Sequence, residues 1–253
     1  MNRPAAYILD LDGVVYRGRT VITGACESID RLRCSGSRVL FLTNNATRTR
    51  EATALRLVDM GIRCNAGDVI SSAYAASVYI KEKYGRSIIY PVGEQGLVEE
   101  LVQAGHTING LDADYVVAGL DREFTYEKLA LALDLIMNGA GFIATNDDAM
   151  LPTEHGFLPG AGSIVAAIEA ASGVVPDVIG KPNKPIMDVL LKEYKLESEE
   201  CVMVGDRLET DILEGIRAGM RTVLVLTGAS GIKDIESSGI RPDIVLESIA
   251  DLE

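Results

Sequence analysis

The sequence has few of the residues that build most transition-metal and redox sites. Its 253 residues include four cysteines, two histidines and no tryptophan. The cysteines are Cys26, Cys34, Cys64 and Cys201. They form no C-x-x-C pair, so we expect buried free thiols in a reducing compartment. The two histidines are His106 and His155. Because they are far apart in the sequence, a histidine-rich zinc site is not expected.

Positive charge and long apolar runs are also scarce. Lys and Arg number 24 against 37 Asp and Glu, so the formal net charge is −13. This balance argues against non-specific nucleic-acid binding, which needs a basic surface. No apolar run reaches the roughly 18 residues of a membrane span, and the N-terminus offers no secretory signal. We therefore expect a soluble, cytoplasmic protein with neither nucleic acid nor membrane as a partner.

What is present is a regular alternation of short apolar runs with helical patterns. Arg38–Thr43 and Arg221–Thr227 are nearly continuous apolar runs, typical of strands buried on both faces. Thr49–Met60, Gly67–Tyr84 and Pro185–Tyr194 have helical spacing. This order predicts an α/β fold with a mostly parallel sheet. No long linker is present, so a second domain would have to be an insertion.

Polar residues follow three of the predicted strands. The strand Tyr7–Asp10 leads into an Asp-Leu-Asp-Gly sequence, Arg38–Thr43 leads into Asn44, and Glu200–Val204 leads into Gly-Asp. Ligands bind beyond the carboxyl ends of strands in open parallel sheets, so these polar groups should meet at one site. The residues concerned are Asp10, Asp12, Thr43, Asn44, Asp206 and Asp211.

These residue types suit phosphoryl transfer. Asp10 and Asp12 repel each other unless a cation or a proton lies between them, and with Asp206 they offer the oxygen ligands that Mg²⁺ prefers. A carboxylate can attack phosphorus to give an aspartyl-phosphate, while its neighbour acts as acid and base. Thr43 and Asn44 can donate to phosphate oxygens, and Lys181 can supply a positive charge. Each motif alone is common in loops and turns, but their order after four apolar segments indicates one site.

At this point the sequence resembles the haloacid dehalogenase superfamily of phosphohydrolases. Its four motifs are matched by Asp10–Gly13, by Thr43 with Asn44, by Lys181, and by Asp206 with Asp211. More narrowly, the chain resembles the NagD-like, p-nitrophenyl phosphatase branch with an α/β cap (subfamily IIA). The segments that carry this narrower likeness are DLDGVVYRG, LTNNATRTR, VVAGLDREFTY, FIATNDDAMLPTEHGFLPGAGSI, VIGKPNKPI and MVGDRLETDI.

The resemblance implies a role for each matching residue. Asp10 would be the nucleophile and a magnesium ligand, and Asp12 the general acid and base, with its backbone carbonyl on the metal. Asp206 would be the third protein ligand, and Asp211 would support the metal's water shell or orient Lys181. The residues implied to hold the phosphoryl group are Thr43, Asn44 and Lys181.

The resemblance also implies a Rossmann-like core with an inserted cap. The core would comprise residues 1–76 and 178–253, and the cap residues 77–177. We expect part of the cap segment Thr145–Gly162 to contact the substrate, a small phosphorylated metabolite. The candidate contacts are Asn146, Asp147, His155 and Gly160. Caps of this kind can support homodimers, but no residue of the sequence identifies a dimer contact or the substrate.

Other functions stay open on the sequence alone. A dehalogenase, a phosphonatase or a phosphotransferase could use the same core. As the resemblance implies, C–halogen cleavage needs neither an acid at the position of Asp12 nor a metal, and phosphonate cleavage uses a different cap lysine. A phospho-accepting signalling domain also combines acids, Thr and Lys, but it would be about half this length. A non-catalytic scaffold would tolerate loss of Asp10 or Asp12, and both are present.

Overall fold

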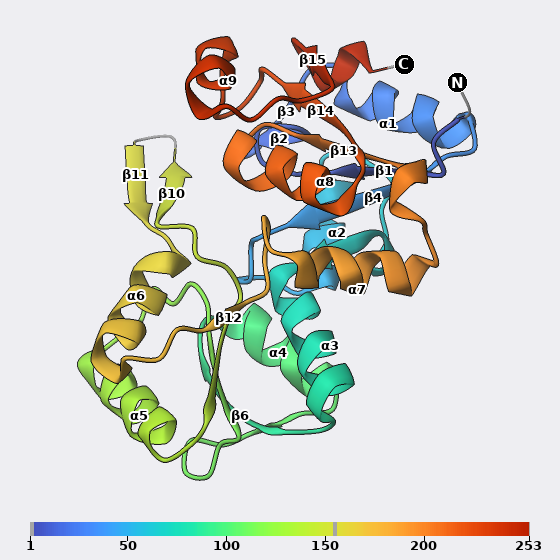
Figure 1. Cartoon of the computed structure of the whole chain (residues 1–253). Helices are drawn as coiled ribbons and strands as arrows, with labels where there is room; N and C mark the ends of the chain where they lie inside the picture. The colour runs from blue at the N-terminus through green and yellow to red at the C-terminus, as the bar shows by residue number, and fades with distance from the viewer. Residues whose placement is uncertain (1–2, 154–155, 253) are drawn as a thin grey trace. The chain divides into compact units, whose positions relative to one another are not determined.

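A computed structural model describes residues 3–153 and 156–252 of the chain (Figure 1). The chain divides into two compact units, each formed by segments that are distant in sequence. The first unit comprises Met1–Thr43, Glu51–Ile70 and Leu190–Glu253. The second comprises Asn44–Arg50 and Ser71–Val189. The chain therefore passes between the units four times, whereas a single insertion of residues 77–177 would need two crossings. The assignment of residues 77–177 as a cap stays a prediction.

A six-stranded sheet forms the centre of the first unit. Its order is β15-β14-β13-β1-β4-β5, and neighbouring strands from β15 to β4 are parallel (Figure 1). The strands are β1 (Ala6–Leu9), β4 (Arg38–Thr43), β5 (Val69–Ser71), β13 (Cys201–Gly205), β14 (Arg221–Val225) and β15 (Ile244–Leu246). A separate small hairpin consists of β2 (Tyr16–Arg17) and β3 (Thr20–Val21).

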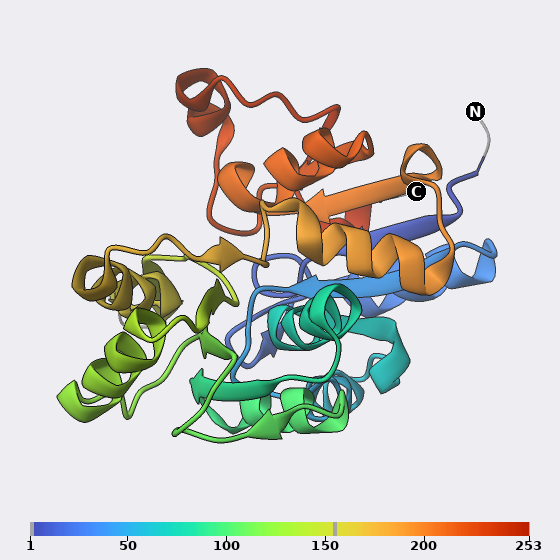
Figure 2. The same cartoon turned by 60° about the horizontal axis from the view of Figure 1, so that its bottom comes forward.

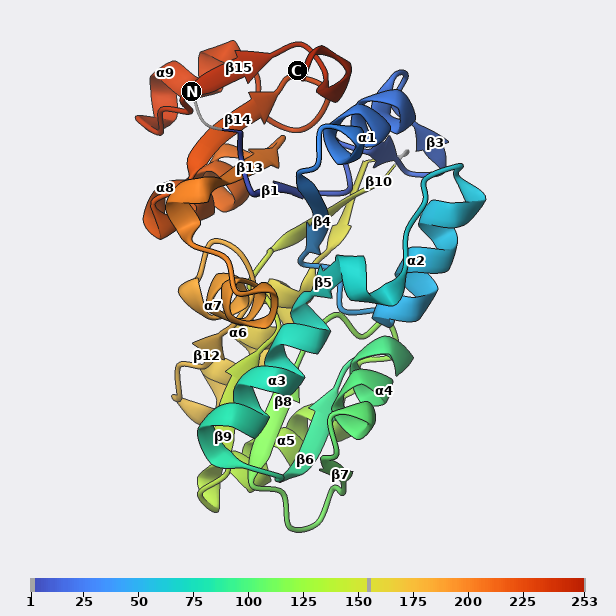
Figure 3. The same ribbon diagram turned by 90° about the vertical axis from the view of Figure 1, so that its right-hand side faces the viewer.

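Helices cover both faces of this sheet, which is why its central strands are continuous apolar runs. The helices are α1 (Ala25–Cys34), α2 (Arg50–Asp59), α8 (Leu213–Ala218) and α9 (Ile232–Ser238). Helix α7 (Lys184–Tyr194) is divided between the two units at Leu190. Ile29 of α1 belongs to one core cluster with Leu9 and Phe41, whereas Gly215 of α8 lies against Met203 on the other face. Figure 3 shows α1 and α8 on opposite sides of β13, β1 and β4.

The second unit contains a five-stranded sheet of order β12-β9-β8-β6-β7, in which all pairings are parallel. Its strands are β6 (Ile88–Val92), β7 (Thr107–Ile108), β8 (Tyr115–Ala118), β9 (Gly141–Ala144) and β12 (Asp177–Val178). Its helices are α3 (Ser72–Tyr84), α4 (Gln95–Gln103), α5 (Tyr126–Met137) and α6 (Ala161–Ser172). An antiparallel hairpin is formed by β10 (Met150–Thr153) and β11 (Gly156–Pro159).

Helices α5 and α6 pack side by side on one face of the second sheet, as the yellow-green and olive helices of Figure 2 show. Leu135 of α5 and Ile168 of α6 share a core cluster with Val116 of β8 and Phe142 of β9. The two parallel sheets, each joined by helices, confirm the predicted α/β class with a Rossmann-like arrangement. Within the described residues, no helix combines the length and apolar character that crossing a membrane requires.

Two elements differ from the sequence-based prediction. The segment Gly67–Tyr84 was expected to be one helix, but Val69–Ser71 forms the edge strand β5 before α3 begins. Its three buried residues include two β-branched side chains, which favour a strand over the first turn of a helix. The sequence pattern indicates a helix over Thr210–Ala218, but Leu208–Ile212 forms a π-helical turn and the α-helix starts only at Leu213.

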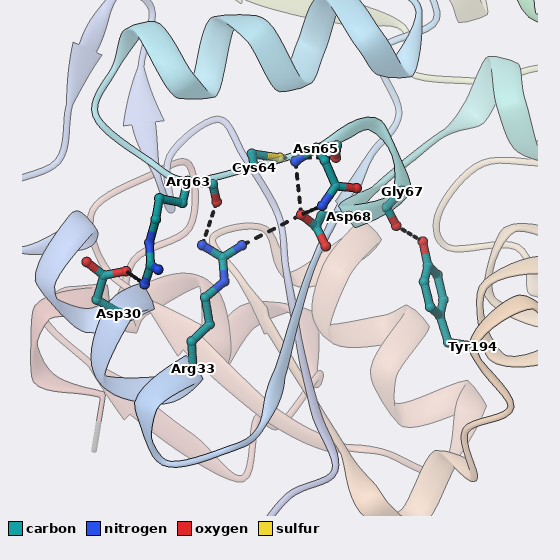
Figure 4. A network of polar contacts seen from close by, with 8 residues as sticks. All are labelled: Asp30, Arg33, Arg63, Cys64, Asn65, Gly67, Asp68 and Tyr194. Atoms are coloured by element: carbon teal, nitrogen blue, oxygen red, sulfur yellow. Dashed lines mark hydrogen bonds and ion pairs between the residues drawn. The ribbon is translucent and has the colours of Figure 1, made fainter.

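A polar network fixes the segment that leads into β5 (Figure 4). The carboxylate of Asp68 accepts hydrogen bonds from the backbone N–H and the side-chain amide of Asn65, at 3.0 and 2.7 Å. A guanidinium nitrogen of Arg33 in α1 lies 4.0 Å from the same carboxylate. The hydroxyl of Tyr194 donates to the carbonyl of Gly67. These contacts join three distant parts of the first unit around its edge strand.

All four cysteines are free thiols, as expected. The expectation that all are buried is wrong for Cys34, which is exposed because it ends α1 outside the buried stripe of that helix. Cys201 is buried, while Cys26 and Cys64 are partly buried. Desolvation raises the pKa of Cys64 to about 12, with a further rise from the charge of Asp68, and it raises the pKa of Cys201 to about 11.

These environments predict a large spread of thiol reactivity. Only the thiolate reacts with a disulfide reagent, and at pH 8 Cys64 and Cys201 are almost entirely protonated because their pKa values lie well above that pH. Titration of the native protein with such a reagent should show a fast phase from exposed Cys34 and much slower phases from Cys64 and Cys201. The variant Cys34→Ser should lack the fast phase, and a fast phase that persists would contradict this assignment.

Candidate functional site

Three carboxylates gather at the carboxyl end of the first unit's sheet. Oxygen atoms of Asp10, Asp206 and Asp211 all lie within 4.8 Å of one another. Asp10 is partly exposed, whereas Asp206 and Asp211 are buried. Three like charges this close repel one another strongly unless a cation or protons offset them. An all-oxygen set of carboxylates fits Mg²⁺ better than a softer metal.

The sheet itself places two of these acids together. Asp10 follows β1 directly, and its backbone N–H donates to the carbonyl of Val204 at 2.9 Å. Asp206 comes directly after β13, the parallel neighbour of β1. Thr43, the last residue of β4, lies on the opposite side of β1 and is buried. The three strands therefore lie side by side in the first unit, so their carboxyl ends share one edge of the sheet. That Thr43 serves the same site as the acids stays a prediction.

Asp211 reaches the cluster through the π-helical turn. Its carboxylate accepts hydrogen bonds from the backbone N–H groups of Asp206 and Arg207, at 3.2 and 3.1 Å. Gly205 allows this approach, because a Cβ on that residue would lie only 2.5 Å from the Asp211 carboxyl carbon. Asp211 thus fixes the backbone that carries Asp206, and its oxygens are near enough to contribute to an ion site.

Asp12 lies beside this group with a different environment. Its carboxylate is not part of the three-acid cluster; the metal ligand expected from this residue is its backbone carbonyl. Although the residue has considerable exposed surface, partial burial of the carboxyl raises the pKa of Asp12, and the charges of Arg56, Arg17 and Arg207 oppose this rise. A raised pKa favours the protonated form that a general acid needs.

The loop after β14 also holds the site, although none of its residues was predicted to do so. The backbone N–H of Ala229 donates to Asp206 Oδ2 at 2.7 Å, and the N–H of Ser230 donates to the Asp206 carbonyl at 2.9 Å. The hydroxyl of Thr227 donates to the carbonyl of Gly13 at 2.6 Å. A Cβ at Gly228 would overlap the Asp206 carboxylate. A sequence signal for this loop was available. The loop follows a fourth apolar strand and begins with Thr-Gly, and the other strand ends were identified by the same pattern of an apolar run followed by polar residues.

The second unit holds Asn44 through both ends of its side-chain amide. The amide nitrogen donates to Asp148 Oδ2 and to the carbonyl of Lys181, each at 3.0 Å. The amide oxygen accepts from the backbone N–H of Lys181 at 2.8 Å. Asn146 donates to the Asn44 carbonyl at 2.9 Å. Because the amide group of Asn44 is engaged within the protein, the donor that we expect it to offer a phosphate is its backbone N–H.

Lys181 follows the short strand β12 and is 2% exposed. Gly180 precedes it, and a Cβ there would lie 2.6 Å from Asn44 Oδ1. The pairing of Asn44 with Lys181 therefore depends on a glycine between β12 and the lysine. Asn44 and Lys181, both predicted to bind the phosphoryl group, are therefore adjacent in the second unit. Their roles in binding stay predictions.

The proposed substrate contacts in the segment Thr145–Gly162 have different environments. Asn146 is buried against Asn44, and Asp147 is exposed. Gly160 is buried at the N-terminal end of α6, where its N–H donates to the carbonyl of Ala149 at 2.8 Å. His155 lies outside the described residues. Substrate binding by these residues stays a prediction.

Comparison with known proteins identifies the family. Residues 7–107 match the family described as haloacid dehalogenase-like hydrolase, and residues 178–252 match a second description, HAD-hydrolase-like. The acid sugar phosphatase of Staphylococcus aureus (strain MRSA252) is 42% identical over 258 residues, covering 100% of both chains. The chain belongs to the haloacid dehalogenase-like hydrolases.

Solved structures of this hydrolase family agree with the narrower resemblance. A p-nitrophenyl phosphatase from Archaeoglobus fulgidus is 34% identical, with a TM-score of 0.95 over 99% of this chain and 98% of that one. NagD from E. coli K-12 is 35% identical, with a TM-score of 0.92 over 100% and 99% of the two chains. The predicted NagD-like branch, the α/β fold and the classification as an enzyme of this hydrolase family are confirmed.

The crowding at Gly228 predicts a specific effect on metal binding. The substitution Gly228→Ala should displace the Asp206 carboxylate and weaken Mg²⁺ binding by roughly tenfold or more, because one of the oxygen ligands expected at the site moves. Calorimetric titration with Mg²⁺ measures this directly. Gly231→Ala is the matched control, since the nearest atom to its added Cβ is 3.7 Å away. Equal affinities in the two variants would contradict the prediction.

Proposed function

We propose that this hydrolase is a Mg²⁺-dependent phosphatase that cleaves small phosphate monoesters through an aspartyl-phosphate on Asp10. The observation that carries the proposal is the cluster of Asp10, Asp206 and Asp211 at the carboxyl end of a parallel sheet. A divalent cation would offset the repulsion within such a cluster. The one partly exposed acid in it, Asp10, is the member best able to reach a substrate.

In the first step the Asp10 carboxylate attacks the phosphorus atom, and the bond from phosphorus to the ester oxygen breaks. Asp12 gives its proton to the departing oxygen, so the alcohol leaves neutral. Its raised pKa supports this role. In the second step Asp12 takes a proton from water, and the resulting hydroxide attacks phosphorus. The bond to Asp10 breaks, inorganic phosphate leaves and both carboxyl groups are restored.

The remaining residues hold and neutralise the phosphoryl group in this proposal. Thr43 offers its hydroxyl, Asn44 its backbone N–H and Lys181 its ammonium group. A Mg²⁺ ion held by Asp10, Asp206 and the backbone carbonyl of Asp12 would supply charge neutralisation at the phosphoryl oxygens. Asp211 supports this arrangement through its hydrogen bonds to the backbone of Asp206 and Arg207.

The names of relatives guide the choice of substrates to test. The relative from Staphylococcus aureus is named an acid sugar phosphatase, and the protein from Archaeoglobus fulgidus is named a p-nitrophenyl phosphatase. Sugar phosphates are therefore the first class to screen, with p-nitrophenyl phosphate as a general reporter. We propose residues 1–76 and 178–253 as the catalytic core and residues 77–177 as the part that selects among these esters.

Replacement of the nucleophile tests the proposal. Asp10→Asn removes the attacking charge with almost no change of shape, so turnover of p-nitrophenyl phosphate should fall to background while the circular dichroism spectrum is retained. Asp112→Asn makes the same chemical change at an exposed position and should leave turnover unchanged. Steady hydrolysis by the Asp10 variant, above that of a mock purification, would refute the assigned nucleophile.

Metal removal tests the cofactor separately. Treatment with EDTA should stop hydrolysis, because the crowded carboxylates then lose the cation that neutralises them, and added Mg²⁺ should restore the rate. The measurement is the steady-state rate before chelation, after chelation and after readdition. Full activity in EDTA would exclude a metal role, while recovery with another divalent ion alone would exclude magnesium as the preferred one.

A further inference from the structure

The segment Asn44–Arg50, which follows the phosphate-binding Thr43 in sequence, packs within the second unit. Helix α4 provides the contact surface. A Cβ at Gly96 would lie only 2.5 Å from backbone atoms of Thr47 and Arg48. The backbone of the segment therefore lies directly against the backbone of the helix, an approach that only glycine allows.

One turn further along α4, Glu100 provides a second contact. The Glu100 side chain is 2% exposed, and its carboxylate accepts a hydrogen bond from the Arg50 backbone N–H at 2.6 Å. Residues four apart lie on the same helix face, so Gly96 and Glu100 contact one segment together. A carboxylate is costly to bury, and this charge-assisted hydrogen bond offsets part of the cost.

Further contacts restrain both ends of the segment. The guanidinium carbon of Arg50 lies 3.5 Å from the centre of the Tyr74 ring. At the other end, the Asn44 carbonyl accepts from Asn146 and from the hydroxyl of Ser72, at 2.9 and 2.7 Å. The backbone that follows Thr43 is thus fixed at both ends by residues of the second unit.

We propose that Glu100, assisted by Gly96, is a positioning residue that sets the affinity for the phosphoryl group. It acts through the Arg50 backbone, which fixes the segment that begins with the phosphate-binding N–H of Asn44. This inference rests on the proposed function, in which that N–H holds the substrate phosphate. It assigns a binding role to α4, a helix that carries none of the residues expected at the site.

Kinetics with p-nitrophenyl phosphate, and inhibition by inorganic phosphate, distinguish positioning from a structural role. Glu100→Ala should raise KM and the phosphate inhibition constant together by about tenfold, the loss expected for one hydrogen bond to a charged group. Glu100→Gln retains an acceptor oxygen and should stay near wild type. Glu99→Ala changes the residue that precedes Glu100 in α4 and is the matched control. It should change neither KM nor the phosphate inhibition constant. Mg²⁺ affinity should be unchanged in all three, because α4 carries none of the expected metal ligands.

The opposite pattern would overturn the inference. If Glu100→Ala lowers only kcat or thermal stability, with KM and the phosphate inhibition constant unchanged, Glu100 has a structural role alone. If that variant does not fold, Gly96→Ala replaces it: its Cβ must push the segment away, so both constants should rise, and unchanged constants would refute the inference.

Hydrogen exchange separates this inference from the proposed function. Amides of residues 45–50 should exchange faster in Glu100→Ala than in Glu99→Ala, whether or not the wild-type protein hydrolyses the reporter. If the wild-type protein does not hydrolyse the reporter, the proposed function is refuted, but the positioning role of Glu100 is not. Unchanged exchange in these amides would refute the positioning role even in an active enzyme.

Discussion

The first unit is organised around the repulsion between its carboxylates. Asp10, Asp206 and Asp211 have oxygens within 4.8 Å of one another, two of the three side chains being buried. Such an arrangement is stable only when backbone donors, together with a cation or protons, offset the negative charge. The N–H groups of Asp206, Arg207 and Ala229 supply the backbone donors. The parallel sheet is what makes the arrangement possible, because β1 and β13 end side by side.

The glycines near this cluster follow from the same constraint. A Cβ at Gly13 would lie 2.6 Å from the Asp206 carboxyl carbon, and Gly205 and Gly228 are crowded in the same way by Asp211 and Asp206. The carboxylates are therefore enclosed by backbone rather than by side chains. This arrangement restricts the positions of the acids without introducing further charge, and it leaves Asp10 as the partly exposed member.

Much of this could be predicted from the sequence because strand ends in a parallel sheet obey simple rules. Asp10, Thr43 and Asp206 each follow a continuous apolar run, and the run predicts both the strand and the edge where the polar residue lies. The edge strand Val69–Ser71 was missed because three residues are too few to show periodicity beside a long helix. The exposed thiol of Cys34 was missed because residue type alone predicts burial.

Contacts between distant segments were harder to predict. Nothing in the sequence near Glu100 indicates that its carboxylate accepts from Arg50, fifty residues earlier. The sequence likewise does not indicate that the segment Asn44–Arg50 packs with residues far along the chain. The local sequence pattern predicts helices and strands and where they end. The residues that a loop contacts depend on packing between distant segments, which the local pattern does not show.

In the proposed mechanism the phosphoryl group is transferred to Asp10 before it is transferred to water. Acid quenching during turnover of a radiolabelled phosphate monoester, followed by borohydride reduction, converts an acyl phosphate on aspartate into homoserine, which peptide sequencing locates. We predict label bound to the protein before reduction and homoserine at position 10 after reduction. Label at another residue, or turnover with none bound at any time, would contradict it.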